Sequence, residues 1–237
     1  MMQRIKRGII KFVYSIIPVP NVPASYSQAG EDAILRFLFQ DLGITDIKYL
    51  DLGTNKPDYS NNTYLFYRNG SRGVCVDADS SLIDAIKAKR PEDKVINAGV
   101  SVSCETEADF YIFDAHPINT FNKKEAEYRA SLGNYKIAKV VKVPLININD
   151  LIKNNFTTYP DLLSVDIEGL DLEVLRSLDY TKYPVPVICV ETCTYSENHI
   201  HPKDLNIAEF MITRGYEVYA DTYINTIFVY KKWFYSK

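Results

Sequence analysis

The chain has 237 residues, of which 46% are hydrophobic and 24% are charged. This length lies near the upper limit for a single hydrophobic core, and the composition is that of a globular protein and not of a disordered one. The 27 Lys and Arg residues are balanced by 30 Asp and Glu residues, and no internal basic cluster stands out. Because a nucleic-acid site needs such a cluster, we expect no nucleic-acid partner.

The first 17 residues mix basic and apolar side chains at a spacing typical of an amphipathic helix. This apolar run is too short to span a bilayer, and it shows no clear cleavage pattern of a signal peptide. We expect the helix to pack on its own domain, with peripheral contact to anionic lipid through residues 1–17 as the alternative. We therefore assign residues 1–24 to this helix and its connector, in a cytoplasmic protein or one held at the inner membrane face.

The remaining residues, 25–237, alternate between strand-like and helix-like segments. This alternation predicts an α/β domain with a mostly parallel central sheet and helices on both faces. The predicted helices span 28–42, 59–70, 80–90, 171–178 and 202–215, and Ser27 is a candidate N-cap for the first. The predicted strands span 46–53, 72–79, 93–101, 108–115, 138–146, 161–169 and 185–192. The closing segments, 216–221 and 224–232, predict an antiparallel hairpin at the sheet edge.

One polar segment interrupts the alternation between the strands predicted at 108–115 and 138–146. Since it shows no amphipathic helix of normal length, we interpret residues 114–137, approximately, as an inserted hairpin or excursion. Loops on a rigid scaffold usually carry specificity, so residues 116–135 are a candidate for recognising a ligand.

The stretch YLDLGTNKPDYSNN, residues 49–62, places Gly53 directly after a predicted strand. In an open parallel sheet, ligands bind at the carboxyl ends of the strands, and a glycine there lets a ligand approach the backbone. Asp77 ends the next strand, where an acidic side chain can accept hydrogen bonds from both hydroxyls of an adenosine ribose. The alternative is that Gly53 permits a tight turn and Asp77 caps the following helix.

The same turn lacks the second and third glycines of a dinucleotide-binding loop, which admit a pyrophosphate. This disfavours NAD. A nucleoside without phosphates, such as S-adenosylmethionine, needs one open glycine, polar groups for its amino-acid end and an acid for its ribose.

Four blocks of the chain resemble the FkbM family of S-adenosylmethionine-dependent methyltransferases, and they occur in the family's order across roughly residues 25–230. The blocks are SYSQAGEDAIL (25–35), YLDLGTNKPDYSNNTYLFY (49–67), GVCVDADSSLI (73–83) and LLSVDIEGLDLEVLRSLD (162–179), followed by ICVET (188–192). The resemblance implies the Rossmann-like class I methyltransferase fold and methylation of hydroxyl groups on sugars, polysaccharides or natural products. Family members often carry Glu-Pro where this chain has Asp77-Ala78, so Asp79 is a rival for the ribose.

The predicted cofactor contacts lie at or beside the strand ends, and the resemblance adds Gln28 from the family's leading block. The full predicted set is Gln28, Asp51, Gly53, Asn55, Asp77, Ala78 and Val100.

Methyl transfer to a hydroxyl needs alignment and removal of the hydroxyl proton. Asp166 and Glu168 end the strand at 161–169, and Glu191 ends the strand at 185–192, so the three acids are expected to converge. Either one is a general base while the others orient the acceptor, or together they hold a divalent cation such as Mg²⁺. The histidines lie in predicted loops from which each can reach an acceptor: His116, His199 and His201.

We therefore predict an S-adenosylmethionine-dependent O-methyltransferase with a glycan or a similar hydroxylated small molecule as its acceptor. Two alternatives remain from the sequence. One is a non-catalytic scaffold that binds the cofactor at a membrane surface, and the other is an NAD-dependent sugar-modifying enzyme. The acceptor's identity, the metal requirement and the oligomeric state stay open.

Overall fold

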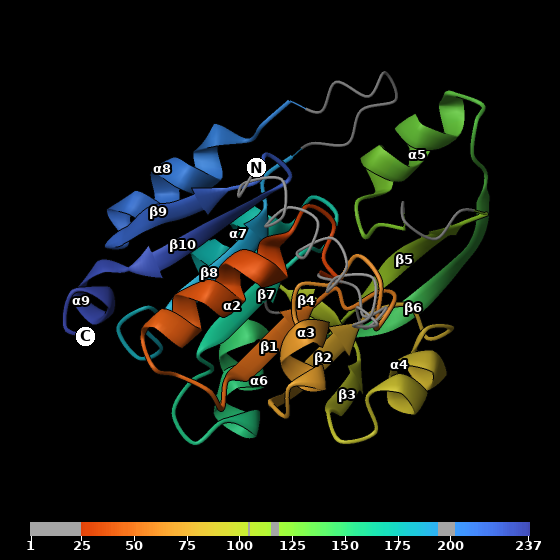
Figure 1. Cartoon of the computed structure of the whole chain (residues 1–237). Coiled ribbons are helices and arrows are strands. Elements are labelled where there is room, and N and C mark those ends of the chain that lie inside the picture. The colour runs from red at the N-terminus through yellow and green to blue at the C-terminus, as the bar shows by residue number, and fades with distance from the viewer. Residues whose placement is uncertain (1–24, 104, 115–118, 194–201) are drawn as a thin grey trace, which may run out of the picture.

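The computed structural model describes residues 25–103, 105–114, 119–193 and 202–237 (Figure 1). The amphipathic helix predicted at the N-terminus and all three histidines lie outside these residues. Within them, no helix is both long and apolar enough to cross a membrane.

A seven-stranded sheet forms the centre of the molecule, in the order β3-β2-β1-β7-β8-β10-β9. Its strands are β1 (Lys48–Leu52), β2 (Arg72–Asp77), β3 (Lys94–Asn97), β7 (Leu162–Val165), β8 (Val187–Glu191), β9 (Tyr216–Asp221) and β10 (Asn225–Tyr230). Neighbouring strands from β3 to β8 are parallel, whereas β10 runs antiparallel to both β8 and β9. The mostly parallel sheet and its antiparallel closing pair are as predicted. From β1, the chain adds β2 and β3 on one side of the sheet and then β7 and the later strands on the other side, so the strand order reverses at β1.

Helices cover both faces of this sheet because its strands bury side chains on both sides. On one face, α2 (Glu31–Asp41), α3 (Tyr64–Arg68) and α9 (Lys231–Phe234) pack against a layer that includes Tyr49 and Val187. On the other, α6 (Ile148–Asn155), α7 (Asp171–Ser177) and α8 (Leu205–Thr213) pack against a layer that includes Leu50 and Ile188. Alternate residues of one strand therefore belong to different cores. Helix α4 (Ile83–Lys89) contacts β3.

A second sheet of three strands stands beside the first, formed by β4 (Gly99–Ser101), β5 (Glu107–Phe113) and β6 (Ile137–Asn147). The strand predicted at 93–101 is in fact broken at Ala98, so that β3 joins the central sheet and β4 joins β6. Figure 1 shows β5 and β6 extending away from the central sheet, with α5 (Lys123–Ser131) near their far end.

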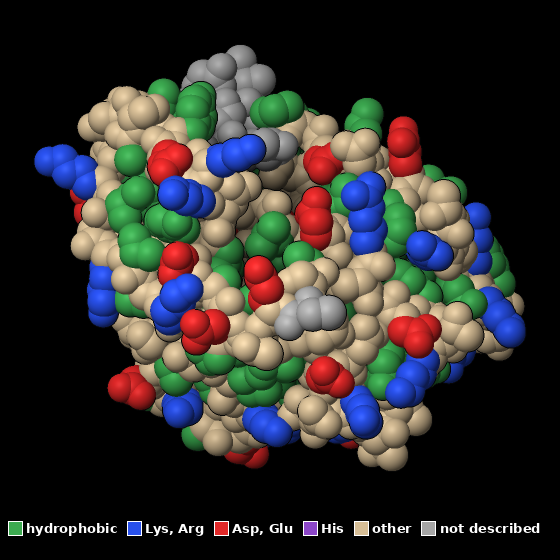
Figure 2. Space-filling model, turned by 180° about the vertical axis from the view of Figure 1, so that it is seen from behind, with side chains coloured by type: hydrophobic (Ala, Val, Ile, Leu, Met, Phe, Trp, Pro, Cys, Tyr) green, Lys and Arg blue, Asp and Glu red, His purple; other side chains and the backbone are tan. Residues whose placement is uncertain are grey.

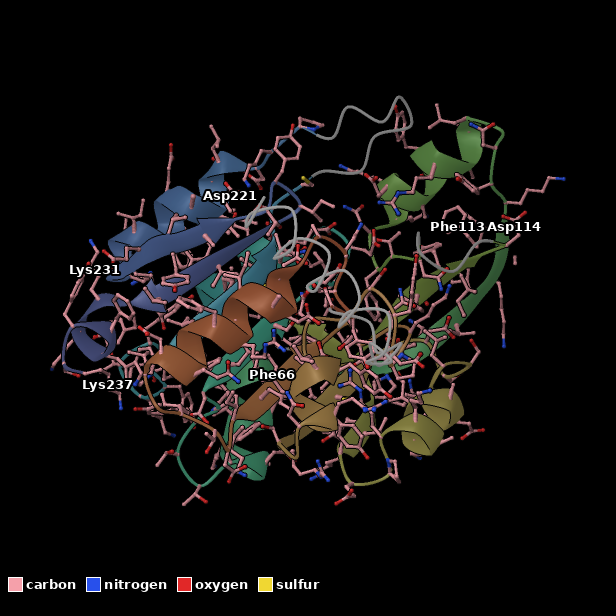
Figure 3. All side chains as sticks on the ribbon, viewed as in Figure 1. Phe66, Phe113, Asp114, Asp221, Lys231 and Lys237 are labelled. Carbon is pink, nitrogen blue, oxygen red and sulfur yellow. The ribbon has the colours of Figure 1, made fainter. Side chains whose placement is uncertain are left out.

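The polar segment between β5 and β6, where no amphipathic helix of normal length was predicted, contains a short and mostly polar helix. Helix α5 has nine residues, and its N-cap is Asn122, whose side chain accepts a hydrogen bond from the Glu125 N–H. It escaped the pattern because little of it is apolar. Ala126 is its main apolar contact and packs with Phe113, which is labelled in Figure 3. Helix α6 was not predicted either.

Charged side chains of both signs are interspersed over the face of the molecule seen in Figure 2. That distribution agrees with the near balance of acids and bases in the sequence.

Arg90 holds the loop that joins β1 to α3 in place from the protein interior, where its side chain is fully buried. Its guanidinium donates to the carbonyl oxygen of Pro57 at 3.0 and 2.8 Å and to Thr63 Oγ1 at 2.8 Å. Asp51 and Asp93 supply the compensating negative charge, at 3.6 and 3.7 Å from Nη1. Because a buried charge is costly without such partners, this network fixes the shape of the loop.

Replacing Arg90 by Met should therefore destabilise the protein strongly, because Asp51 and Asp93 would remain buried without a cation. We expect the free energy of unfolding to fall by about 3–5 kcal/mol, measured by chemical denaturation. Lys89→Met is the matched control, since the Lys89 side chain is 46% exposed in its ion pair with Asp58 and should have little effect. Similar losses for both variants would contradict this account of the loop.

Candidate active site

A cleft opens at the carboxyl ends of β1, β2 and β7, where the direction of strand addition reverses. The space in and before this cleft, including the solvent at its open mouth, is about 700 Å³. The location is where open α/β sheets place their ligands, since loops from strands on the two sides diverge there. Its lining includes the predicted residues Gly53, Asn55, Asp77, Ala78, Val100, Asp166 and Glu168.

Gly53 is required at this cleft by the neighbouring strand end. Its φ of +80° lies in the left-handed region, and a Cβ at this position would come within 1.7 Å of the Asp166 carbonyl oxygen. The sequence suggested that the glycine leaves room for a ligand. The structure adds a second reason, because the missing side chain also makes room for the backbone at the end of β7.

Asp77 lies at the end of β2 with both carboxylate oxygens turned to backbone donors. The N–H of Asn55 donates to Oδ2 at 2.7 Å, and the N–H of Asp79 donates to Oδ1 at 2.8 Å. Burial raises the pKa of Asp77 to about 6, although these two hydrogen bonds oppose the rise. Each carboxylate oxygen can accept two hydrogen bonds, so Asp77 keeps capacity to accept from a ligand.

Asp79, the predicted rival, is committed to the protein itself. Its Oδ1 accepts from the N–H and the hydroxyl of Ser81 at 2.9 and 2.7 Å. Its Oδ2 accepts from the side-chain amide of Asn119 at 3.0 Å. Asp79 therefore ties the start of α4 to the segment that follows β5, and it accepts more hydrogen bonds from the protein than Asp77 does.

Asp166 and Glu168 follow β7 and line the cleft, and Glu191 at the end of β8 lies behind them. Burial raises the pKa of Asp166 to about 7, and the charges of Asp171 and Asp51 add to the rise. Burial and the charges of Asp166 and Glu168 raise the pKa of Glu191 to about 11. The protonated form of Glu191 is therefore favoured, and its hydrogen bond to Asp166 favours the ionised form of Asp166.

Glu168 has a left-handed backbone conformation, with φ of +56°, and its side chain is 31% exposed. Burial and the charge of Asp166 raise its pKa to about 8, while Arg129 opposes the rise. Arg129 comes from α5, with Nη1 at 3.8 Å from Glu168 and Nε at 2.9 Å from Glu125. Arg129 was not among the predicted site residues, although its spacing from Glu125 is that of a helical ion pair.

Two predicted cofactor residues are not part of the cleft lining. Asp51 is only 2% exposed, and its carboxylate accepts from the Asn61 amide at 3.0 Å and the Thr63 hydroxyl at 2.7 Å. Asp51 therefore supports the β1–α3 loop from the protein interior and does not face the cleft. Gln28 is exposed on the segment before α2. Gly30 stands at the N-cap position of α2, but the hydroxyl of Ser27, the predicted N-cap, accepts from the N–H groups of Gly30 and Asp32, each at 3.2 Å.

Over the described part of the chain, no group of three or more His, Cys, Asp or Glu side chains is arranged to hold a metal ion. The cation-binding alternative for the three acids therefore has no support from their geometry.

Comparison of the sequence with known protein families identifies one matching family. Residues 51–218 match the methyltransferase FkbM domain. Curated proteins yield no significant match.

The chain is similar in structure to several solved proteins with which it shares little sequence identity. One is a TehB-like SAM-dependent methyltransferase from Corynebacterium glutamicum, with 11% identity, 97% of each chain covered and a TM-score of 0.39. Another is an O-methyltransferase from Bacillus cereus in complex with SAH, with 12% identity, 94% of this chain and 88% of that chain covered and a TM-score of 0.40.

A third is the magnesium protoporphyrin IX methyltransferase of Synechocystis with bound SAM, with 10% identity, 84% and 76% coverage and a TM-score of 0.40. The family match covers well over half of the chain and leaves the NAD alternative without support. Together with the strand order of the central sheet, it establishes that this protein belongs to the FkbM family of S-adenosylmethionine-dependent methyltransferases and has their Rossmann-like class I fold.

Proposed function

We propose that the protein methylates a hydroxyl group of a sugar, a polysaccharide or a related small molecule. The observation that carries this proposal is that Asp166 and Glu168 line the same cleft as Gly53 and Asp77. A group able to take a proton therefore shares a space with the residues suited to an adenosine ligand.

The cleft fits S-adenosylmethionine in the chemistry of its lining. Asp77 offers acceptor capacity for the ribose hydroxyls, and Leu82 and Phe110 offer apolar surface for a ring. When bound, this cofactor supplies a methyl group on a positively charged sulfur that is already a good leaving group.

The acids at the ends of β7 and β8 would prepare the acceptor. Alcohols are weak acids, so a carboxylate within hydrogen-bond reach is needed to take the proton as the oxygen attacks. We assign this role to Asp166, because its pKa near neutrality suits a general base. Glu191 holds Asp166 through a hydrogen bond, and Glu168 is assigned to orient the acceptor beside Arg129.

The segment between β5 and β6 would recognise the acceptor. Asn119 and Phe121 from this segment line the cleft, and α5 brings Arg129 to Glu168. We therefore keep residues 114–137 as an insertion within a methyltransferase domain of residues 25–237.

Asp166→Asn should lower kcat by about 10²- to 10⁴-fold at saturating cofactor, because an amide cannot take the hydroxyl proton. Activity is measured as S-adenosylhomocysteine formed with a panel of sugars and polysaccharides, and mass spectrometry locates the added methyl group. Methylation of nitrogen, or of acceptors whose hydroxyls are all blocked, would overturn the proposal.

The rate should also depend on pH through the same residue. Since the pKa of Asp166 is raised to about 7, its carboxylate form is scarce below that value and predominates above it. We expect kcat/KM for S-adenosylmethionine, which reports groups of the free enzyme, to rise with pH across about pH 6–8 and then to level off. A kcat/KM that stays constant over this range would rule out Asp166 as the base.

Asp77→Asn should weaken the binding of S-adenosylhomocysteine by about 10- to 100-fold, since it removes charged hydrogen bonds to the ribose. Isothermal titration calorimetry measures this affinity. Asp84→Asn, at an exposed position on α4, is the control and should bind normally. Normal binding by Asp77→Asn together with weak binding by a folded Asp79→Asn would move the ribose site to Asp79.

A further inference from the structure

The charged side chains that line the cleft are all acidic among the residues that the structure describes. They are Asp77, Asp79, Asp166 and Glu168. Glu191 and Asp171 add acidic groups just behind this lining, and both act on the pKa of Asp166 or of Glu168. Because the protein's net charge is only −3, this concentration of acids belongs to the cleft and does not reflect the whole chain.

These acids are only partly neutralised by the described basic side chains. Arg129 approaches Glu168 to 3.8 Å, but it is shared with Glu125, to which it is closer at 2.9 Å. The charges that act most strongly on Asp166 and Glu191 are those of other acids. Burial and mutual repulsion therefore both oppose ionisation of the group, and a positive charge placed beside it would relieve that repulsion.

We infer that Asp166 and Glu168 make this cleft selective for positive charge. It binds a cationic adenosine ligand in preference to a neutral ligand of the same shape, because only the cation offsets the repulsion between the carboxylates. This inference rests on the proposed function, and it goes further by naming the property that separates cofactor from product. S-adenosylhomocysteine, the product of methyl transfer, has no charge at sulfur and loses this attraction.

The test uses two ligands of similar shape that differ in charge at one position. In sinefungin a carbon replaces the sulfur of S-adenosylmethionine and an ammonium group replaces its methyl group, whereas S-adenosylhomocysteine is neutral at the sulfur. Calorimetric titration of the full chain should show sinefungin binding at least about tenfold more tightly than S-adenosylhomocysteine. S-adenosylmethionine, a cation without an N–H at that position, should share the preference, and high salt should reduce it.

Substitutions locate the source of the preference. Glu168→Gln and Asp166→Asn should each reduce the sinefungin to S-adenosylhomocysteine affinity ratio by at least about threefold, because each removes one negative charge. Glu127→Gln removes an equal charge from the surface of α5, where the Glu127 side chain is 61% exposed, and should leave the ratio unchanged. Glu168 is partly exposed, so Glu168→Gln should fold even if Asp166→Asn does not, and thermal denaturation checks both.

The outcomes separate this inference from the proposal beneath it. Equal affinities for the charged and neutral ligands, or a ratio that neither substitution changes, would overturn the inference and leave the cofactor site standing. Binding of none of the three ligands would overturn both.

Discussion

The close approach of the ends of β1 and β7 is the constraint on which the whole site depends. The N–H of Asp166 donates to the Leu52 carbonyl oxygen at 3.0 Å, and the N–H of Gly53 donates to the Val76 carbonyl oxygen at 2.9 Å. These bonds join the tips of three strands into one rim. Only a residue without a Cβ fits at position 53 between them, so a single glycine brings the acid of β2 and the acids of β7 to one space.

Buried charge is balanced under the β1–α3 loop but only partly balanced around the cleft. Beneath the loop, Arg90 is surrounded by acceptors and by acids that balance it, and the result is a rigid support. Around the cleft, Asp166 and Glu168 are crowded with other acids and are only partly balanced. Unbalanced charge of this kind is characteristic of sites that act on ligands, because it shifts pKa values toward neutrality.

Much of the fold was predictable because it is encoded locally. Alternating apolar segments gave the strands of the central sheet, and the hairpin of β9 and β10 followed from its two adjacent apolar runs. Most cleft residues were predictable for the same reason, since they directly follow strands whose ends must meet at one edge. The helix α5 was missed because its polar sequence gives no apolar stripe, and its stability depends on contacts with β5.

Residues that act across long distances in the chain could not be found from sequence patterns. Arg90 is 39 positions from Asp51, and Arg129 is 39 positions from Glu168, so neither pairing has a periodic signal. Asp51 shows the reverse case. Its place two residues before Gly53 suggested contact with the cofactor. Its carboxylate instead accepts hydrogen bonds from Asn61 and Thr63 of the β1–α3 loop, which folds over it. Successive residues of a strand face opposite sides of the sheet, so closeness in sequence did not place this side chain in the cleft.

The break at Ala98 divides the chain between two sheets, and this division has a consequence for how the enzyme can diversify. The wall that carries Phe110 and Phe121 is built on β4, β5 and β6, and none of these strands pairs with the central sheet. The strand hydrogen bonds of the central sheet do not depend on that wall, but the wall reaches the nucleoside side of the cleft through the hydrogen bond from the Asn119 amide to Asp79. A change in the wall can therefore leave the central sheet intact only if this contact is kept, because Asp79 also holds the start of α4.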